Sequence, residues 1–421
     1  MYQRRLVDDE LDLLLPHLAA IALDGPKGVG KTLTCRQRAA TIINLDDPAT
    51  REVVTADPRA ILRGAPPVLI DEWQQVVATW DVVRRAVDDG AAPGSFLLTG
   101  SVTPLVDAPA HSGAGRIASL RMRPMSLSER NLQRPTVSLS ALLAGGAVIE
   151  GDSGLTLSDY THEIVASGFP GIRGLPARVA RVQLDSYLTR AFSRSLSDEV
   201  GTTSPSPDGL RSWATAYAAA TGTTASWESI RDAASSGSSE PPAKTTAIRY
   251  REWLSALWLL DPLPAWRPPG SPLQRLTIGP KHHLADPALA ARLLKVGAED
   301  LMAGRALPFG GHGALLGALF ESLATLSVRT LSQAAEAEAS HLRTQRGEHE
   351  IDLIVQGDGR RLVAMEVKLA SSVADADVSH LHWFKRELGD AVSDLVVLTT
   401  GPTAYRRRDG IAVVPLALLG P

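Results

Sequence analysis

The sequence predicts an α/β protein with more than one domain, and three observations support this prediction. A Gly-rich loop at residues 25–32 lies between an apolar run of strand type and a stretch with helical character. Further apolar segments that end in acidic or polar residues alternate with amphipathic stretches up to about residue 150. In the C-terminal third, carboxylates occur on segments that read as adjacent strands. Because 421 residues exceed one ordinary hydrophobic core, two or three domains are expected.

The Gly-rich loop has the form of a P-loop. Residues 21–32 read IALDGPKGVGKT, which contains G-x-x-x-x-G-K-T in the strand–loop–helix context that this motif requires. Glycines let backbone N–H groups approach a phosphate closely, and the N-terminus of the next helix adds partial positive charge. We expect Lys31 to reach the β- and γ-phosphates of ATP and the Thr32 hydroxyl to bind Mg²⁺. The predicted nucleotide-binding residues are Gly25, Pro26, Lys27, Gly28, Val29, Gly30, Lys31 and Thr32.

An acidic pair follows the apolar strand-like run 68–70, about forty residues after the P-loop. Asp71 is expected to hold Mg²⁺ through water, and Glu72 to polarise the water that attacks the γ-phosphate. The alternative is a strand that ends in solvated acids. The next apolar segment, SFLLTGS, ends at residues 99–101, where a polar side chain would lie between the attacking water and the phosphate.

Three arginines after this strand are candidates for an arginine finger, acting within the chain or on a neighbouring subunit. They are Arg116, Arg121 and Arg123. Ordinary surface arginines are the alternative interpretation.

The middle of the chain is expected to be helical. Three stretches of helical character, 208–222, 225–234 and 243–266, suggest a winged-helix or helix-turn-helix arrangement with the third as the recognition helix. Its first half carries side chains suited to phosphates or base edges, namely Lys244, Thr245, Thr246, Arg249 and Arg251. Because winged helices also serve as protein-packing modules, both roles stay open.

The C-terminal third contains a pattern typical of the PD-(D/E)XK nuclease fold. Glu321 is a single acid within a long apolar helical stretch, and Asp352 lies in a strand-like segment. Glu366 and Lys368 are two apart on the next strand and so share a face. Carboxylates from two strands and a helix suit Mg²⁺ or Mn²⁺, which Asp352 and Glu366 would bind, while Lys368 would activate water. The alternative is a hairpin with solvated charges.

Bulk composition narrows the class of protein. The formal net charge of −3 gives no global field for nucleic-acid binding, so any DNA or RNA contact needs a local basic patch. Cys35 is the only cysteine, which excludes a disulfide framework and fits a reducing cytoplasm. The N-terminus does not read as a signal peptide, and no apolar run approaches the length of a membrane span. We therefore expect a cytoplasmic protein without membrane contact, and the scarcity of Lys suggests a bacterial source.

The order of the motifs resembles one bacterial and archaeal family, the AAA-type ATPases with a C-terminal DUF4143 region. The segments that carry the resemblance are GPKGVGKT, VLIDEWQ, LLTGS, PMSLSE, KHHLADPALAARLL, GALFES, EIDLIV and MEVK. It implies an ASCE-type P-loop ATPase domain over residues 1–150, a winged-helix-like region over 151–300 and a restriction-endonuclease-like α/β domain over 301–421. It also implies that Lys31 and Thr32 bind nucleotide and Mg²⁺, that Asp71 binds Mg²⁺ and that Glu72 is the catalytic base. A nuclease-like site is implied at Glu321, Asp352, Glu366 and Lys368.

Two functions from different classes follow. The first is an ATP-hydrolysing enzyme that acts on nucleic acid, for which DNA is the favoured hypothesis. Its C-terminal nuclease site would be gated by the nucleotide state. The second is a nucleotide-dependent binding switch whose nuclease-like domain is a catalytically silent module for docking DNA or protein. Homo-oligomer formation or a protein partner fits either function.

Overall fold

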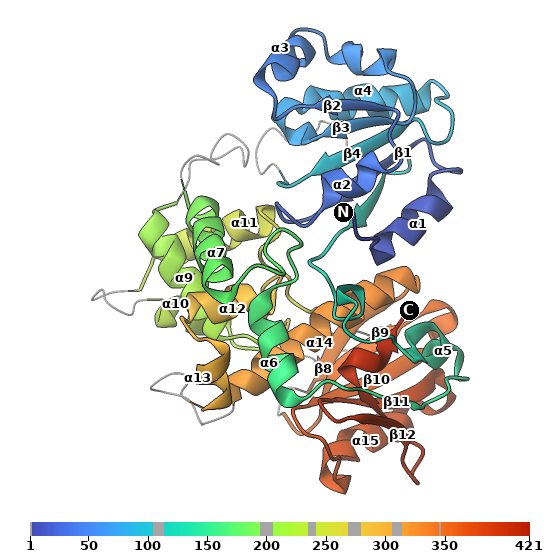
Figure 1. Ribbon diagram of the computed structural model, residues 1–421, viewed down its shortest axis with the longest axis vertical. Coiled ribbons are helices and arrows are strands. Elements are labelled where there is room, and N and C mark those ends of the chain that lie inside the picture. Colours follow the sequence, from blue (N-terminus) through green and yellow to red (C-terminus); the bar gives the residue numbers. More distant parts are fainter. Residues whose placement is uncertain are drawn as a thin grey trace.

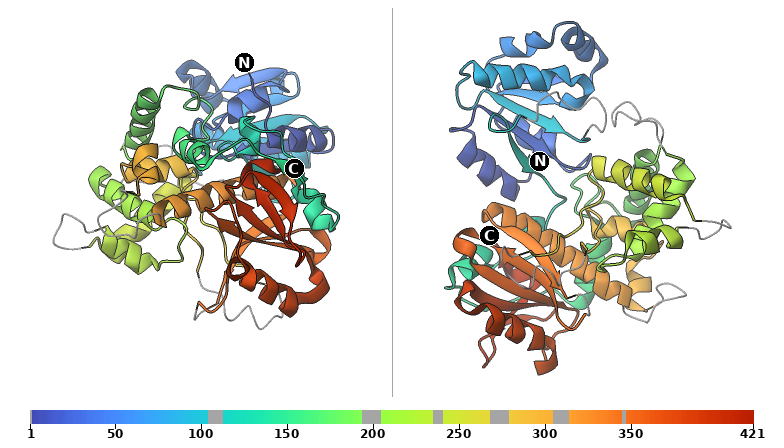
Figure 2. Two further views of the ribbon diagram at one scale, coloured as in Figure 1. Left: turned by 60° about the horizontal axis from the view of Figure 1, so that its bottom comes forward. Right: turned by 180° about the vertical axis from the view of Figure 1, so that it is seen from behind.

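The computed structural model describes residues 2–103, 113–193, 205–234, 241–267, 279–304, 314–344 and 347–421. A sheet near the N-terminus and a second sheet near the C-terminus lie at opposite ends of the molecule, with a helical region beside them (Figure 1). Figure 2 shows the same arrangement from two further directions. The mixed α/β class predicted from the sequence is confirmed.

The N-terminal sheet is parallel throughout its described strands and has the order β2-β3-β4-β1-β5. Its strands are β1 (Ala20–Asp24), β2 (Thr41–Asn44), β3 (Val68–Asp71), β4 (Phe96–Gly100) and β5 (Ala118–Arg121), and the helices of this domain are α1 (Leu6–Leu14), α2 (Lys31–Arg36), α3 (Pro48–Ala56) and α4 (Ala78–Asp88). Because β4 lies between β1 and β3, the carboxyl ends of these three strands meet at one edge. The P-loop and the acidic pair both follow strands that end at this edge.

Both faces of this sheet are buried, as expected of a parallel sheet. Ile21 and Leu23 of β1 belong to the large apolar core that continues through the rest of the chain. Ala20 and Ala22 belong to a separate cluster on the opposite face. This alternation follows from the two-residue side-chain period of a strand and ties one face of the sheet to the helical region.

The middle of the chain is helical, as predicted. Its helices are α6 (Leu157–Ala166), α7 (Ala177–Ala191), α9 (Pro207–Ala219), α10 (Trp227–Ala233), α11 (Lys244–Ala256), α12 (Pro287–Leu293) and α13 (Ala298–Met302). In α7 the buried residues Ala180, Leu184 and Leu188 recur every four positions, so one face of the helix packs inward. The helical spacing of the sequence continues after α7 as far as Gly201, and residues 194–204 lie outside the described residues.

Two extended segments after α11 pair with each other in antiparallel fashion, and we call residues 259–265 and 281–285 the paired segments. Isolated bridges join Leu260 to Leu284 and Leu263 to Lys281. The first segment also bridges to the C-terminal sheet through Ala265 and His341. The paired segments therefore connect the helical region directly to the C-terminal domain.

The C-terminal sheet is mixed, with the strand order β7-β12-β13-β11-β10-β9-β8. Its strands are β7 (Gly151–Asp152), β8 (Glu338–Arg343), β9 (Glu350–Gln356), β10 (Leu362–Lys368), β11 (Val392–Thr399), β12 (Thr403–Arg406) and β13 (Ala412–Pro415). The long helix α14 (Ala314–Ala334) shares a core with Leu353 and Val363. The helix α15 (Ser379–Leu388) shares another with Ile354 and Ala364, so the two helices cover opposite faces of the sheet.

Residues 137–152 lie with the C-terminal domain, although the predicted domain boundaries assign 137–150 to the first domain and 151–152 to the helical region. The strand β6 (Val137–Ser138) pairs with β14 (Leu419–Gly420), and β7 pairs with β12. Between them, α5 (Leu139–Ala144) packs on β10 and β11 through buried leucines. These contacts span more than 200 residues of sequence. The short apolar helix α5 carries no motif, so a sequence pattern does not reveal them.

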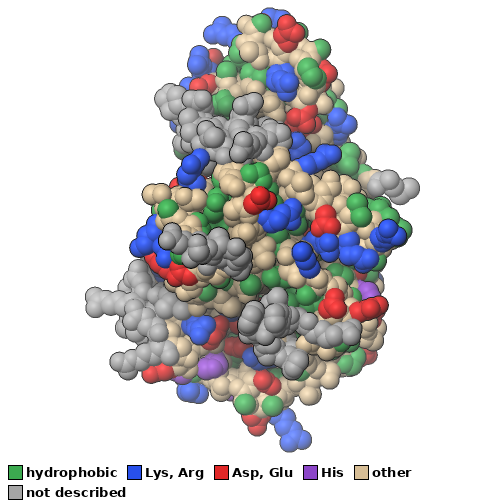
Figure 3. All heavy atoms as spheres, turned by 90° about the vertical axis from the view of Figure 1, so that its left-hand side faces the viewer, with side chains coloured by type: hydrophobic (Ala, Val, Ile, Leu, Met, Phe, Trp, Pro, Cys, Tyr) green, Lys and Arg blue, Asp and Glu red, His purple; other side chains and the backbone are tan. Residues whose placement is uncertain are grey.

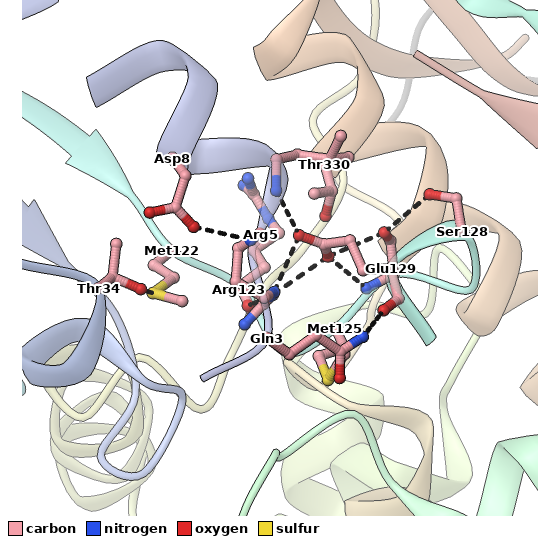
Figure 4. A network of polar contacts seen from close by, with 12 residues as sticks. Gln3, Arg5, Asp8, Thr34, Met122, Arg123, Met125, Ser128, Glu129 and Thr330 are labelled. Carbon is pink, nitrogen blue, oxygen red and sulfur yellow. Dashed lines mark hydrogen bonds and ion pairs between the residues drawn. The ribbon is translucent and has the colours of Figure 1, made fainter. Parts of the chain in front are cut away.

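A buried ion pair fixes the segment before α1 to the short 3-10 turn Ser128–Arg130. Arg5 Nε lies 2.9 Å from Glu129 Oε1, and both side chains are buried. Figure 4 shows these two side chains pointing toward each other. Burial by itself raises the pKa of Glu129, but the Arg5 guanidinium and the backbone N–H groups of Leu6 and Ser126 outweigh it and hold that pKa below its usual range.

A second buried junction joins all three regions of the chain. The Asp261 carboxylate, in the first of the paired segments, lies 3.1 Å from Arg121, 2.8 Å from Arg123 and 2.7 Å from Arg329 of α14. Burial raises the pKa of Asp261, but the three guanidinium groups outweigh burial and hold it far below its usual range. The sequence offered Arg121 and Arg123 as arginine-finger candidates, whereas the structure engages both in this internal cluster.

Candidate functional site

The P-loop connects β1 to α2, and among the described residues its buried lysine has no carboxylate partner. Lys31 is the first residue of α2 and is 4% exposed. Its Nζ donates hydrogen bonds to the carbonyl oxygens of Gly25 (2.7 Å) and Pro26 (3.0 Å). Burial lowers the pKa of Lys31 to about 8, although Glu72, Asp24 and Asp71 act against this shift. A buried ammonium held only by carbonyls is prepared to bind an incoming anion.

Glycine is required at two points of the loop. A Cβ on Gly25 would lie 2.2 Å from the backbone oxygen of Met122, a distance no side chain tolerates. Gly30, which caps α2, has a φ of 113°, in the left-handed region that favours glycine. The loop conformation that directs backbone N–H groups at a phosphate therefore depends on these residue types.

The acidic pair lies beside the P-loop, as the strand order requires. Thr32 Oγ1 donates a hydrogen bond to Asp71 Oδ1 at 2.7 Å. Thr99, near the end of β4, is in register with Asp71, and its hydroxyl donates a hydrogen bond to the same Asp71 oxygen. The predicted magnesium-binding hydroxyl and carboxylate are therefore in direct contact. Mg²⁺ fits this donor set because it consists only of oxygen atoms.

Glu72 is held in place by three neighbours. Its Oε2 accepts hydrogen bonds from the Ser101 hydroxyl and from the Gln74 amide, and its backbone N–H donates to Thr99 Oγ1 at 3.2 Å. Glu72 has a φ of 58°, which is unusual for a residue other than glycine and places strain at this position. Sequence reasoning missed Gln74, although its position two residues after Glu72 was visible in the motif DEWQ.

Two cavities flank the P-loop. One, of about 250 Å³, is lined by Gly30 and Thr34 on one side and by Met122, Met125 and Pro170 on the other. The second, of about 510 Å³, is lined by Lys27 and Gly28 of the loop, by the end of β4, and by α7. Arg116, the remaining arginine-finger candidate, lines neither cavity and instead pairs with Asp88 at 2.8 Å.

The predicted carboxylates of the C-terminal third do converge. Glu321 projects from α14, Asp352 from β9, and Glu366 and Lys368 from β10. Lys368 Nζ lies 3.1 Å from Glu366 Oε2, and Asp352 Oδ2 accepts a hydrogen bond from a backbone N–H of β10. Helix and strands therefore deliver all four side chains to one place.

A lysine that sequence reasoning did not identify lies in the middle of this cluster. Lys281, from the paired segments, is 1% exposed and its Nζ lies 2.8 Å from Glu321, 3.1 Å from Glu350 and 2.9 Å from Asp352. Although burial lowers the pKa of Lys281, the three carboxylates outweigh burial and raise it above its ordinary value. In the sequence Lys281 belongs to the charged run KHH next to apolar residues, and this run does not indicate which carboxylates Lys281 contacts.

Burial and the neighbouring charges shift the pKa values of the three carboxyl groups in this cluster in different directions. Burial, and then the Asp352 charge, raise the pKa of Glu321 to about 7. The same two causes raise the pKa of Glu366 well above its ordinary value, and its Oε1 is buried without a hydrogen-bond partner in the described structure. Burial raises the pKa of Asp352 too, but Lys281 and the backbone N–H of Val367 hold it below its usual range.

The cluster fits a divalent cation only in part. Among the described residues no group of three or more His, Cys, Asp and Glu side chains is placed to hold a metal ion, and the Lys281 ammonium supplies positive charge at this position instead. The unpartnered Glu366 Oε1 next to Asp352 nevertheless leaves two carboxylates that a single cation would satisfy.

The helix that carries Glu321 is the one described helix long and apolar enough to cross a membrane by length and composition. Within its most apolar 18-residue window, 67% of residues are buried inside the protein. Such burial is typical of the core helix between a sheet and neighbouring helices.

Comparison with known proteins assigns families to most of the chain. An AAA domain family matches residues 18–131 and the domain of unknown function DUF4143 matches residues 316–419. A further domain of unknown function, DUF8612, matches residues 157–300. The first two matches confirm the family resemblance inferred from the motifs.

Similar proteins include uncharacterized proteins of two mycobacteria. Rv2008c of Mycobacterium tuberculosis and Mb2031c of Mycobacterium bovis are each 28% identical over 434 residues, which cover 99% of this chain and 84% of theirs. Among solved structures, the Walker-type ATPase PABY2304 of Pyrococcus abyssi is 14% identical with a TM-score of 0.41, covering 70% of this chain and 96% of its own. The ORC2 protein of Aeropyrum pernix is 16% identical with a TM-score of 0.27, covering 71% and 92%. The chain combines an AAA-type P-loop ATPase domain with a C-terminal DUF4143 domain.

Proposed function

We propose that this protein binds and hydrolyses ATP with Mg²⁺ and uses the nucleotide cycle to control an action on nucleic acid. The observation that carries the ATPase part is the contact between the P-loop and the acidic strand. Thr32 of the loop bonds directly to Asp71, and the neighbouring Glu72 is fixed by Ser101. These are the groups that phosphoryl transfer to water needs at one place.

Each side chain has a defined role in this proposal. Thr32 and Asp71 would hold Mg²⁺, which supplies positive charge to the β- and γ-phosphates when bound. Lys31 exchanges its two carbonyl partners for phosphate oxygens. Glu72 accepts a hydrogen bond from the attacking water and orients it, while Ser101 keeps the carboxylate in position.

The smaller cavity supports a position for the nucleobase. It adjoins Gly30 and Thr34, and its wall includes the apolar side chains of Met122, Met125 and Pro170. A flat base buries well against such apolar groups. We propose that adenine binds here.

A Glu72→Gln variant tests the ATPase proposal. The amide keeps the shape of the side chain but accepts no proton, so this variant is expected to bind ATP normally in calorimetry and to hydrolyse it about 10²-fold or more slowly. Arg181→Ala, an exposed change on α7, serves as a control with unchanged turnover. Equal turnover in Glu72→Gln and the wild-type protein would mean that another group activates the water.

For the C-terminal domain we propose a metal-dependent nuclease site on a restriction-endonuclease-like fold. Support comes from the convergence of Asp352, Glu366 and Lys368 and from the unpartnered buried oxygen of Glu366. Mg²⁺, or Mn²⁺ in its place, would be held by Asp352 and Glu366, and Lys368 would orient the attacking water. Glu321 would join only after Lys281 releases it.

A second candidate function is a nucleotide-dependent binding switch whose C-terminal domain is silent. The position of Lys281 favours it, because this ammonium already neutralises Glu321 and Asp352. Incubation of the protein with Mg²⁺ or Mn²⁺ and single- or double-stranded DNA and RNA, with and without ATP, separates the two. Cleavage that disappears in Asp352→Ala supports the nuclease. Intact ATP hydrolysis without any cleavage supports the switch.

For nucleic-acid contact we propose a winged helix formed by α9, α10, α11 and the paired segments. Support comes from three helices followed by an antiparallel pair, and from the exposed Lys244 at the start of α11. Arg251 lies over the Trp227 ring at 4.9 Å and so contributes to packing. Figure 3 shows Lys and Arg side chains on this side of the molecule, interspersed with Asp, Glu and hydrophobic side chains. Lys244→Ala is expected to weaken DNA binding and to reduce its dependence on salt concentration, measured by fluorescence anisotropy.

A further inference from the structure

The larger cavity beside the P-loop brings a second region of the chain to the nucleotide site. It has a volume of about 510 Å³, within the range of pockets that hold small ligands. Lys27 and Gly28 of the P-loop line one side, and Ser101 lines it at the end of β4. The opposite wall comes from α7, which contributes Tyr187 and Arg190.

This cavity lies on the catalytic side of the loop. Ser101 lines it and also donates a hydrogen bond to Glu72, the group proposed to orient the attacking water. Lys31 and the loop residues before it are the parts of a P-loop that reach the β- and γ-phosphates. The terminal phosphate of ATP and the attacking water would therefore lie next to this cavity.

Among the described residues that line this cavity, Arg190 alone carries a guanidinium group. It is exposed, and within the described part of the chain its side chain forms no ion pair. The three arginines that the sequence suggested are occupied elsewhere, since Arg121 and Arg123 bind Asp261 and Arg116 binds Asp88. The helix that carries Arg190 is itself held in place, because its Asp185 pairs with Arg292 of α12 at 2.6 Å.

We propose that Arg190 is a catalytic residue that binds the terminal phosphate of ATP within the same chain. This inference rests on the proposed ATPase function and names a residue that function did not include. Water attacks the γ-phosphorus, the bond between this phosphorus and the β,γ-bridging oxygen breaks, ADP leaves with the electron pair, and the water proton passes to Glu72 or to phosphate. Arg190 neutralises the negative charge that develops on the transferred oxygens. Binding of ATP would thus also draw α7, and with it the helical region, toward the P-loop.

The test compares Arg190→Ala with the wild-type protein and with Arg181→Ala, an exposed arginine on the same helix that does not line the cavity. Arg190→Ala is expected to lower ATP turnover about 10³-fold, with unchanged turnover in Arg181→Ala. Thermal unfolding of all three proteins shows whether the variants are folded. Normal turnover in Arg190→Ala would overturn the proposal while leaving the ATPase function intact. Absence of turnover in the wild-type protein would overturn both.

A binding measurement adds a second readout. In a Glu72→Gln background, which prevents consumption of the ligand, Arg190→Ala is expected to bind ATP about tenfold more weakly and ADP equally well, because only ATP carries the γ-phosphate. An equal loss for ATP and ADP would show that Arg190 does not contact the terminal phosphate. Arg190→Lys is expected to restore part of the preference for ATP.

Mixing two inactive variants distinguishes action within one chain from action between subunits. Lys31→Ala removes nucleotide binding but keeps Arg190, whereas Arg190→Ala keeps the P-loop. If Arg190 acts within its own chain, an equimolar mixture has no more turnover than the sum of the separate variants. Recovered turnover in the mixture would overturn the proposed action within one chain.

Discussion

The two sites of this protein each contain a buried lysine, and the two lysines have opposite surroundings. Lys31 of the P-loop is 4% exposed and bonds only to carbonyl oxygens, so burial lowers its pKa to about 8. Lys281 is 1% exposed and contacts three carboxylates, which raise its pKa. The P-loop therefore lacks the negative charge that its lysine needs, whereas the C-terminal cluster already contains the positive charge that its acids need.

This difference separates a site that is ready for a ligand from one that the chain itself satisfies. A nucleoside triphosphate would supply negative charge to Lys31, just as Asp352 and Glu321 supply negative charge to Lys281. A divalent cation at the C-terminal cluster would have to share its ligands with Lys281 or displace it. The paired segments carry both Lys281 and Asp261, so displacement of Lys281 would also disturb the cluster that contacts the ATPase domain.

Replacing Lys281 by methionine should give the largest effect on stability. Methionine has a similar length without charge, so Glu321, Glu350 and Asp352 would be left without their counter-ion. Removal of one partner of a buried ionic cluster typically costs about 3–5 kcal/mol, and we expect a loss of this size in urea unfolding at pH 8. Lys244→Met, an exposed change, should stay within about 0.5 kcal/mol of wild type. A loss for Lys281→Met below about 1 kcal/mol would mean that the carboxylates have another source of neutralisation.

Replacing Lys31 by methionine should weaken ATP binding strongly without lowering the stability of the fold. ATP binding is expected to weaken at least about 10²-fold, corresponding to about 3 kcal/mol, in calorimetry. The free energy of unfolding without nucleotide should stay the same or increase, because a buried ammonium without a carboxylate partner is removed. Retained micromolar ATP binding would contradict the P-loop assignment, and strong destabilisation would contradict the comparison of the two lysines.

Added Mg²⁺ should show whether a cation and the Lys281 ammonium compete for the same carboxylate oxygens at the C-terminal site. In Lys281→Met the carboxylates lack their ammonium, so millimolar Mg²⁺ should raise the free energy of unfolding by about 1 kcal/mol more than in the wild-type protein. The additional change Asp352→Asn should abolish this gain. Equal effects of Mg²⁺ on all three proteins would show that a cation and Lys281 do not compete for the same oxygens.

The pH dependence of stability tests the same carboxylate cluster without replacing Lys281. In the folded protein the pKa of Glu321 is raised from 4.5 to about 7, chiefly by burial and next by the Asp352 charge. A raised pKa contributes stability that is complete below about pH 4.5 and is lost as the pH rises through about 7. At about 1.4 kcal/mol for each pKa unit, the wild-type protein should therefore lose about 3 kcal/mol relative to Glu321→Gln between these values in urea unfolding.

Asp24 of the P-loop strand provides the matched control for this titration. Burial raises its pKa from 3.8 to about 6, with Lys31 and Arg121 acting against the shift. Its contribution should be lost between about pH 3.8 and 6, so Asp24→Asn and Glu321→Gln should differ from wild type over different windows. A common window for both variants would contradict the separate origin of the two shifts.

The elements of the nucleotide site could be predicted because each depends on neighbouring residues. The P-loop is one contiguous segment whose glycines and lysine act through the local backbone, and Asp71 and Glu72 end the strand that such a loop accompanies. The convergence of Asp352 and Glu366 was also within reach, since antiparallel strands close in sequence place them side by side.

The sequence by itself determined the α/β class, the P-loop with its acidic strand and the set of C-terminal carboxylates. Only the tertiary structure decided which charges neutralise one another. Lys281 reaches Asp352 across 71 residues and Arg123 reaches Asp261 across 138, so neither pair leaves a periodic or local signal. Arg190 likewise leaves no local signal, because it lies far from the P-loop in sequence although both line one cavity in the structure. Buried ion pairs form wherever packing brings opposite charges together, and packing is a property of the whole chain.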